Sequence, residues 1–284
     1  FKLYDTYGFP LELTKEIANE NFIDVDEAAF KKLMEEQRER ARNSMQKVVL
    51  ADDKNYADKP ATNFVGYTQN EAKAKVLAII KNGEEVDYTN EDDIADVILD
   101  VTPFYAESGG QVGDSGILEL SNAETIEVLK TFKVQNVFAH RVKGAICKGD
   151  SVIARIDTAK RAETQKHHSL AHLLQAALIS VLGKEVHQAG SQVEPDRTRY
   201  DFSFERAMTK DEIAKTESLI NFWINEGLAG KTEIMDIEEA KNSGAMALFG
   251  EKYGEKVRVV SFFDENNPGK CVSKELCGGC HCAN

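Results

Sequence analysis

Two groups of metal-binding side chains, far apart in the sequence, constrain how this chain can fold. His168 and His172 stand four residues apart, so on a helix both imidazoles project from one face. Near the end of the chain, Cys277 and His281 add a thiol and a third imidazole, donors that Zn²⁺ prefers. One ion bound by both groups would join the two segments in space and mark the functional centre.

This donor set leaves two chemistries open. If all four side chains bind together, a tetrahedral Zn²⁺ has no position left for water, and its role is structural. If one of them is loose, the open position takes water or a substrate group. Cys280 and Cys282 are alternative thiolates, and Cys277 with Cys280 would form a plausible half-site. Ser169 stands where zinc proteases have their general-base glutamate, so the helix is not of that class.

Composition narrows the class of protein. The length of 284 residues suggests two or three domains, and 42% apolar with 29% charged residues describe an ordinary globular chain. No apolar run approaches bilayer length and no leader opens the chain, so we expect no membrane partner. Four of the five cysteines lie between Cys271 and Cys282, which favours a metal site in a reducing cytoplasm over a disulfide framework. Because Phe1 falls inside a motif, we expect a piece of a longer polypeptide.

The charge of the chain limits its contacts with nucleic acid. A formal net charge of −13 argues against broad, non-specific binding, so contacts with RNA phosphates require local concentrations of Lys and Arg. A helix expected after Asp24 or Asp26 has such a face, in which basic residues alternate with glutamates. Two interpretations stay open for it, solvated ion pairs or contact with an RNA backbone. Its basic residues are Lys31, Lys32, Arg38, Arg40 and Arg42.

Periodicity predicts an α+β protein in three parts, of which the first two are residues 1–48 and 49–156. The first part is predicted to be helical. The second contains short apolar runs separated by turn signals such as Asn82-Gly83 and Lys148-Gly149, the pattern of a small antiparallel β-barrel. The predicted strands are residues 76–80, 97–101, 117–120, 126–132, 137–142 and 152–156.

The third part, residues 157–284, is predicted to form an α+β sandwich that contains the metal. Asp157 caps a long helix that ends at Gly183, and this helix carries the histidine pair. The other expected elements are strands at residues 198–204, 232–237 and 256–263 and a helix at residues 211–226.

A glycine-rich stretch from Phe104 to Asp114 is a second candidate for binding. Gly109 and Gly110 permit a ligand to approach the backbone closely, and Gln111 offers a polar contact. The stretch matches neither the dinucleotide fingerprint nor the phosphate loop. The alternative is a tight turn within the β-domain.

Together these stretches resemble the alanyl-tRNA synthetases, in the part that carries their editing domain. The resemblance covers most of the chain and follows the order of the family's motifs. Free-standing editing proteins and the threonyl-tRNA synthetase editing domain share the His and Cys/His motifs, but the helical opening favours the synthetases. The matching stretches are residues 3–10, 104–114, 168–174, 188–191, 199–202, 244–253 and 275–279.

The resemblance implies hydrolysis of the ester that joins serine or glycine to the 3′ end of tRNA(Ala). It implies that Gln188 lines the amino-acid pocket and that Gly109, Gly110 and Gln111 lie near the terminal adenosine, which makes them substrate-binding candidates. His168, His172 and Gln188 are the catalytic candidates. The implied zinc ligands are His168, His172, Cys277 and His281.

By the same resemblance, residues 1–48 are the helical end of a tRNA-recognition region. ATP and alanine would be bound by a ligase catalytic domain that lies outside this chain, as does a C-terminal dimerisation region. The sequence departs from the family pattern at three positions. Ala171 and Cys280 replace threonines beside the expected metal ligands, and His167 replaces an asparagine.

Two other functions compete with editing. The chain would be a tRNA-docking module if its zinc were purely structural and hydrolysis weak. It would be an unrelated metal-dependent hydrolase if it cleaved small esters without tRNA. We expect Cys277 to be the ligand and Cys280 to be a spectator.

Overall fold

The computed structural model describes residues 1–7, 11–21, 23–34, 56–247, 254–267 and 269–283. The chain divides into two compact units, Phe1–Asp58 and Lys59–Asn284, and each is described by itself. Within the described residues, no helix combines the length and the apolar character that crossing a bilayer requires.

The first unit is helical, as predicted. It contains α1 (Lys2–Tyr7), α2 (Leu11–Glu20) and a further helix whose described part is residues 27–34. Asp26 caps this last helix, because its Oδ1 accepts a hydrogen bond from the backbone N–H of Ala29 at 2.8 Å. Two residues of the expected basic face, Lys31 and Lys32, are exposed. The other three, Arg38, Arg40 and Arg42, lie outside the described residues.

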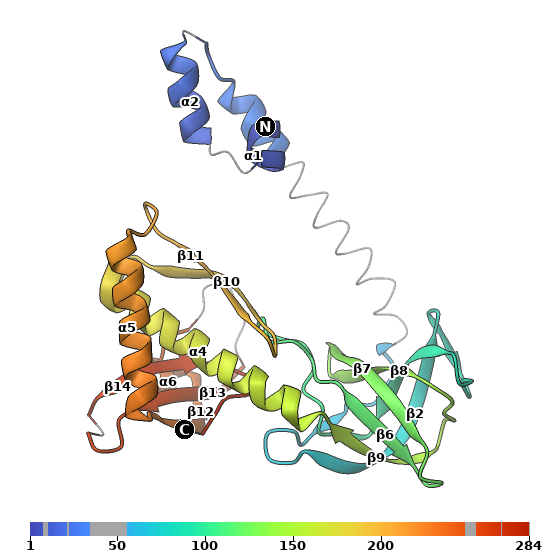
Figure 1. Cartoon of the computed structure of the whole chain (residues 1–284). Coiled ribbons are helices and arrows are strands. Elements are labelled where there is room, and N and C mark those ends of the chain that lie inside the picture. Colours follow the sequence, from blue (N-terminus) through green and yellow to red (C-terminus); the bar gives the residue numbers. More distant parts are fainter. Residues whose placement is uncertain (8–10, 22, 35–55, 248–253, 268, 284) are drawn as a thin grey trace. The chain divides into compact units, whose positions relative to one another are not determined.

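The second unit begins with the predicted antiparallel barrel, which is confirmed (Figure 1). The long strand β2 closes it, since residues 71–75 pair with β9 and residues 76–80 pair with β4. In order around the barrel, the strands are β2 (Glu71–Lys81), β4 (Ile94–Leu99), β8 (Val137–Lys143), β7 (Thr125–Val134), β6 (Gly116–Leu120) and β9 (Ser151–Ile156).

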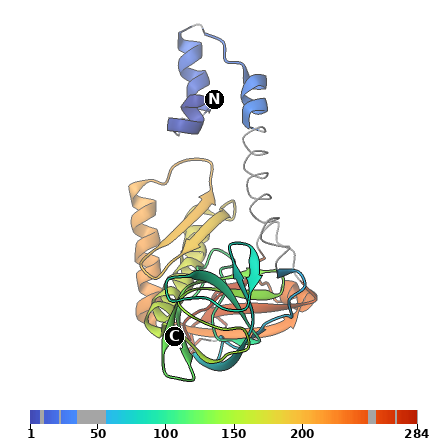
Figure 2. The same cartoon turned by 90° about the vertical axis from the view of Figure 1, so that its right-hand side faces the viewer.

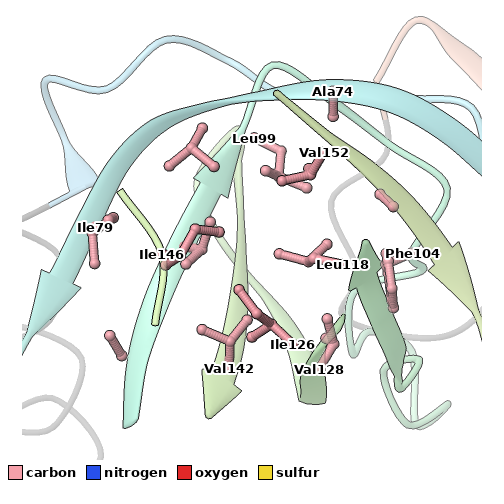
Figure 3. Close-up of a cluster of buried hydrophobic side chains, with 14 of the residues drawn as sticks. Ala74, Ile79, Leu99, Phe104, Leu118, Ile126, Val128, Val142, Ile146 and Val152 are labelled. Carbon is pink, nitrogen blue, oxygen red and sulfur yellow. The ribbon is translucent and has the colours of Figure 1, made fainter. Parts of the chain in front are cut away.

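Aliphatic side chains fill the barrel. Alternate residues along half-buried strands point inward, so Leu118 from β6, Val128 from β7 and Leu99 from β4 meet in one cluster. Figure 3 shows these side chains directed into the space between the strands. The apolar runs that identified the strands in the sequence are therefore the ones that build the core.

One strand prediction in the barrel needed correction, and one strand beside the barrel was missed. The run at residues 97–101 is broken at Asp100, whose Oδ1 accepts hydrogen bonds from the N–H groups of Lys75 and Val101. The chain continues as β5 (Val101–Thr102), which pairs with β1 (Asn63–Phe64) outside the barrel. The predicted turn at Asn82-Gly83 is confirmed by φ values of 52° and 82°. It leads to β3 (Glu84–Val86), a strand that the sequence did not predict because two of its three residues are glutamates.

Helix α4 (Thr158–Leu182) crosses the rest of the unit and positions the histidine pair. Both predicted ends are confirmed, because Asp157 Oδ1 accepts from the N–H of Lys160 at 3.0 Å and Gly183 has a φ of 105°. Leu173 and Ala177 pack on Trp223 of α5 (Lys210–Glu226). The other elements are β10 (His187–Val193), β11 (Thr198–Ser203), β12 (Ala229–Asp236), α6 (Ile237–Asn242), β13 (Lys256–Phe263) and β14 (Cys271–Leu276).

The sheet β12–β13–β14 and the hairpin β10–β11 complete an α+β arrangement around α4 (Figures 1 and 2). The predicted strand at residues 232–237 extends instead from Ala229 to Asp236, and Ile237 begins α6. The strands β10 and β14 were not predicted, because small and polar residues obscure their alternation.

A buried ion pair joins the barrel to the first turns of α4. The Arg161 guanidinium makes two hydrogen bonds to the Asp114 carboxylate and donates to the carbonyls of Gly66 at 2.8 Å and Pro103 at 3.2 Å. The N–H of Tyr105 also donates to Asp114, at 2.6 Å. Burial alone would lower the pKa of Arg161, but the hydrogen bond to Asp114 and the negative charges of nearby groups together outweigh it, so that pKa lies above its usual value. Because every partner here is buried and paired, the joint fixes the barrel against the helix.

Candidate metal centre

The structure brings the four predicted ligands together. His168 and His172 lie one turn apart on α4, and Cys277 and His281 follow the end of β14. One donor atom from each residue lies within 4.8 Å of all the others. Cys277 Sγ is 3.5 Å from His168 Nε2 and 3.2 Å from His281 Nε2. Tetrahedral bonds of about 2.0–2.3 Å separate neighbouring donors by roughly 3.4–3.6 Å, so these positions fit one metal ion.

Burial keeps the imidazoles of the cluster neutral. It lowers the pKa of His168 and of His172 to about 3 each, and it lowers the pKa of His281 well below the usual value. Burial also raises the pKa of the Cys277 thiol to about 12. A neutral imidazole keeps a lone pair for a cation, and a bound cation favours the thiolate. The four side chains therefore present a site suited to a metal ion and not to an anion.

Gln111 determines which nitrogen of His168 faces the cluster. The backbone N–H of Cys280 donates to Gln111 Oε1 at 2.8 Å. Because a backbone N–H can only donate, the amide atom that faces it must be the oxygen of Gln111 and not its nitrogen. The same Oε1 lies 2.8 Å from His168 Nδ1, which must therefore carry the proton. Nε2 is left with its lone pair, directed at Cys277. An outer partner of this kind fixes the tautomer of a metal-binding histidine.

Glu275 stands in a similar relation to His172. Its Oε1 lies 3.7 Å from His172 Nδ1, which has no hydrogen-bond partner among the described residues. Ser273 Oγ donates to the same oxygen at 2.8 Å, and burial raises the pKa of Glu275 to about 7. Alternation along β14 directs Ser273 and Glu275, and then Cys277, to one face of the sheet. A carboxylate is thus placed behind the second histidine.

A cavity of about 310 Å³ opens beside the cluster. Gln188 from β10, Tyr200 from β11 and Ala171 from α4 line it, and the Tyr200 hydroxyl lies 3.4 Å from Gln188 Oε1. Tyr200 also donates to Gln175 of α4, which ties the hairpin to the helix. Of the predicted site residues, Gly109, His168, His172, Gln188 and Cys277 line this cavity.

The glycine-rich loop contributes in two different ways. Gly109 has a φ of 57° and faces the cavity, whereas Gly110 packs on Ser191, whose carbonyl oxygen would lie 2.5 Å from an added Cβ. Gln111 is completely buried, and its Oε1 is engaged by His168 and Cys280. The loop thus supports the cluster from behind as well as lining the cavity.

The segment after Cys277 is shaped around the histidines. A Cβ on Gly279 would lie 2.0 Å from His168 Cε1, so only glycine fits beside that ring. Arg258 of β13 donates to the carbonyls of Cys277 at 2.9 Å and Gly279 at 2.6 Å. Its guanidinium also lies 4.4 Å from the centre of the Tyr67 ring.

Two possible competing ligands lie outside the cluster. Cys280 is buried, and burial raises the pKa of its thiol. Of the nearby charges, those of Arg161 and Asp114 have the largest effect on that pKa. His167 Nδ1 lies 3.1 Å from the Glu163 carbonyl of its own helix. Among the described residues, the metal-binding group contains Cys277 but neither of these side chains.

The comparisons with known proteins identify the family. The family model described as tRNA synthetases class II (A) matches residues 1–160, more than half of the chain. The chain belongs to this family. It is also 46% identical over 285 residues to the alanine–tRNA ligase of Nitrosospira multiformis, a match covering 99% of the chain and 32% of the relative.

Two further relatives agree. The alanine–tRNA ligases of Acaryochloris marina and Pelotomaculum thermopropionicum are each 45% identical to the chain, which is covered completely. The matches cover 32% and 33% of these relatives, so the chain spans about a third of their length. All four residues of the metal-binding group lie beyond the family-model match but inside the matches to these ligases.

Sequence reasoning missed the residues that hold the candidate ligands in place. Glu275 had a usable signal, since it lies two positions before Cys277 on a strand and therefore on the same face. Gln111 was noted only as a substrate contact. The roles of Arg258 and Tyr67 had no signal in the sequence, because their contacts join segments that are distant along the chain.

Proposed function

We propose that this chain carries the editing site of an alanine–tRNA ligase, which hydrolyses the ester of tRNA(Ala) wrongly charged with serine or glycine. The observation that supports it most is the cluster of His168, His172, Cys277 and His281 beside a cavity of about 310 Å³, in a chain similar to alanine–tRNA ligases over its full length. The five free cysteines are compatible with the reducing cytoplasm.

The need for such a site follows from the size of alanine. A pocket that accepts alanine cannot strongly reject glycine, or serine with one extra hydroxyl, because so small a difference contributes little discrimination. A second site that hydrolyses the wrong products removes these errors. ATP and alanine would be bound in the two thirds of the parent ligase that this chain does not span.

Zn²⁺ is the metal we propose, because a thiol with imidazoles is a donor set that it prefers. When bound, it would polarise the ester carbonyl or lower the pKa of a water molecule. Gln111 and Glu275 would orient the two histidines. Gln188, held near the Tyr200 hydroxyl, would offer its amide to the aminoacyl group, and Gly109 would let the nucleoside approach the backbone.

A docking function remains an alternative, because four protein donors are enough to occupy all four positions of a tetrahedral metal ion. The zinc would then be structural, and the chain would dock tRNA with little hydrolysis. His281 is absent from the described lining of the cavity, whereas the other three ligands line it. Water or a substrate group that enters the cavity would therefore approach the metal from the side of these three ligands.

The purified chain is expected to release serine from Ser-tRNA(Ala), and removal of the metal with a chelator should abolish that release. The reason is that the cavity's reactive side is formed by the metal ligands. Release of labelled serine measures the reaction, with Ala-tRNA(Ala) as the control substrate. Full activity after verified metal loss would exclude a metal-centred mechanism. No hydrolysis by the metal-loaded chain, with tRNA still bound, would favour the docking function.

Cys277→Ala should lose Zn²⁺, whereas Cys280→Ala should retain it. Cys277 Sγ is within 3.5 Å of two imidazole nitrogens, but Cys280 is not among the four described side chains whose donor atoms come together. The two variants remove the same group two glycines apart, so each controls for the other. Elemental analysis of the purified proteins measures occupancy. Full zinc retention by Cys277→Ala would overturn the assignment.

Gln111→Met should weaken Zn²⁺ binding by roughly 10- to 100-fold, whereas Gln111→Glu should stay near the parent. Methionine keeps the volume but offers His168 Nδ1–H no oxygen, and glutamate restores an acceptor at the position of Oε1. Competition with a chromophoric chelator measures the affinity. If the methionine variant bound zinc as tightly as the parent, Gln111 would not position His168.

A further inference from the structure

We propose that the hydroxyl of Tyr200 makes the editing site prefer serine to glycine, by accepting a hydrogen bond from the serine side chain. This inference rests on the proposed function and names a specificity-determining residue for it. Tyr200 lies on β11 and lines the cavity of about 310 Å³ together with Gln188 and three of the candidate metal ligands. Its hydroxyl is therefore within reach of an aminoacyl group whose ester lies at the metal centre.

The hydrogen bonds of Gln175 determine which way the Tyr200 hydroxyl points. Gln175 of α4 is buried, and its Nε2 donates to Met246 Sδ at 3.6 Å. Because a thioether can only accept, the amide nitrogen faces Met246 and the amide oxygen faces Tyr200. Tyr200 therefore donates its single hydrogen to Gln175 Oε1. Burial and the charge of Glu275 raise the pKa of Tyr200, so the hydroxyl keeps this hydrogen at neutral pH. What it presents to the cavity is an acceptor oxygen.

Gln188 places a second acceptor beside the first. Its Oε1 lies 3.4 Å from the Tyr200 hydroxyl, whose hydrogen is already used by Gln175. The α-ammonium group, which serine, glycine and alanine all carry, can bond to Gln188 Oε1 and to the Glu275 carboxyl group in the same lining. The serine hydroxyl is the one further donor, and the Tyr200 oxygen is placed to accept from it.

The other hydroxyls of the lining lie on a different side of the cavity. Among the described residues they belong to Tyr105, Ser108 and Ser191. The first two are part of the glycine-rich stretch, and Ser191 packs against Gly110 of that stretch. The proposed function assigns this side to the nucleoside. Tyr200 supplies the hydroxyl on the side assigned to the aminoacyl group.

An acceptor at this position would act against two amino acids at once. A site built to hydrogen-bond a substrate hydroxyl rejects an analogue that lacks it, because the polar group of the site is left unpaired. Glycine and alanine both lack the hydroxyl. The contact that favours serine over glycine would therefore also help to spare correctly charged Ala-tRNA(Ala).

Tyr200→Phe tests the role of the hydroxyl, because it keeps the ring and removes only the oxygen. The probes are 3′-amino-3′-deoxyadenosines that carry serine or glycine through an amide bond, which resists hydrolysis far better than an ester. Calorimetric titration measures the two affinities. We expect the parent to prefer the seryl probe, and the variant to bind it about 10-fold more weakly with unchanged affinity for the glycyl probe. Tyr88→Phe, which removes an exposed hydroxyl of the barrel, is the matched control and should keep both affinities.

The ratio of the two affinities separates specificity from a structural contact. If Tyr200 only tied the hairpin to the helix, or bonded the α-ammonium group, both probes would lose affinity equally, and the inference would be overturned. A parent chain without preference for the seryl probe would overturn it as well. Zinc content should be the same in parent and variant, so the change cannot come from the metal. If the parent prefers the seryl probe through Tyr200 but never hydrolyses Ser-tRNA(Ala), the proposed function fails and the specificity role stands.

Discussion

Replacing His168 with alanine is expected to abolish the release of serine from Ser-tRNA(Ala). The same change should also weaken Zn²⁺ binding. Loss of a residue that only hydrogen-bonds to a ligand lowers metal affinity by roughly 10- to 100-fold, and loss of the ligand itself should lower it further. His168 lines the cavity, its Nε2 lies 3.5 Å from Cys277 Sγ, and its Nδ1 is engaged by Gln111. Gly279, which packs directly against the imidazole ring, has no side chain that could replace it as a ligand. Elemental analysis and a deacylation time course measure the two losses.

His167→Ala is the matched control for this substitution. It removes an imidazole from the adjacent position of the same helix, where Nδ1 contacts only the Glu163 carbonyl among the described residues. Metal content and turnover should remain those of the parent chain. Unchanged turnover in His168→Ala would count decisively against a metal-centred mechanism. Loss of metal with full turnover would leave the metal a structural role.

Arg161→Met is expected to lower the free energy of unfolding by about 3–5 kcal/mol, the cost of breaking a buried ion pair. Methionine fills much of the volume but leaves the Asp114 carboxylate buried without its partner. The carbonyls of Gly66 and Pro103 lose a donor at the same time. Urea denaturation followed by the fluorescence of Trp223, the single tryptophan, measures the loss.

Arg199→Met controls for the loss of an arginine as such. Its ion pair with Asp201 is at the surface, where the arginine side chain is 65% exposed, and should contribute no more than about 1 kcal/mol. Combining Arg161→Met with Asp114→Asn should cost less than the sum of the two single changes, because no unpaired charge remains. Equal, small losses in Arg161→Met and Arg199→Met would show that the joint is not held by this pair.

Local patterns in the sequence predicted the frame of the second unit well. Short apolar runs separated by turn signals identified the six strands of the barrel, because the side chains that fill the core come from these runs. The capping residue Asp157 and Gly183 marked both ends of α4, since the signals for helix termini are local. Strands with small or polar residues, such as β10 and β14, gave no such signal and were missed.

The metal-binding group was predictable for a different reason. Two histidines at helical spacing and a Cys/His segment are rare enough in the sequence to stand out together. Residue type and spacing could not choose between Cys277 and Cys280. Only the path of the chain after β14 distinguishes them, because it brings the Cys277 thiol to the histidines and leaves Cys280 outside the metal-binding group of the described residues.

By itself, the sequence determined the α+β class, the barrel, the long helix and the four candidate ligands, because these depend on periodicity, capping and donor chemistry within short segments. The tertiary structure alone decided what surrounds the ligands. Gln111 from the barrel sets the tautomer of His168, Glu275 stands behind His172, and Tyr67 donates to the carbonyl of Gly278, the residue after Cys277. These contacts link residues far apart along the chain, and the orientation of a buried polar group depends on partners that folding alone brings within hydrogen-bond distance.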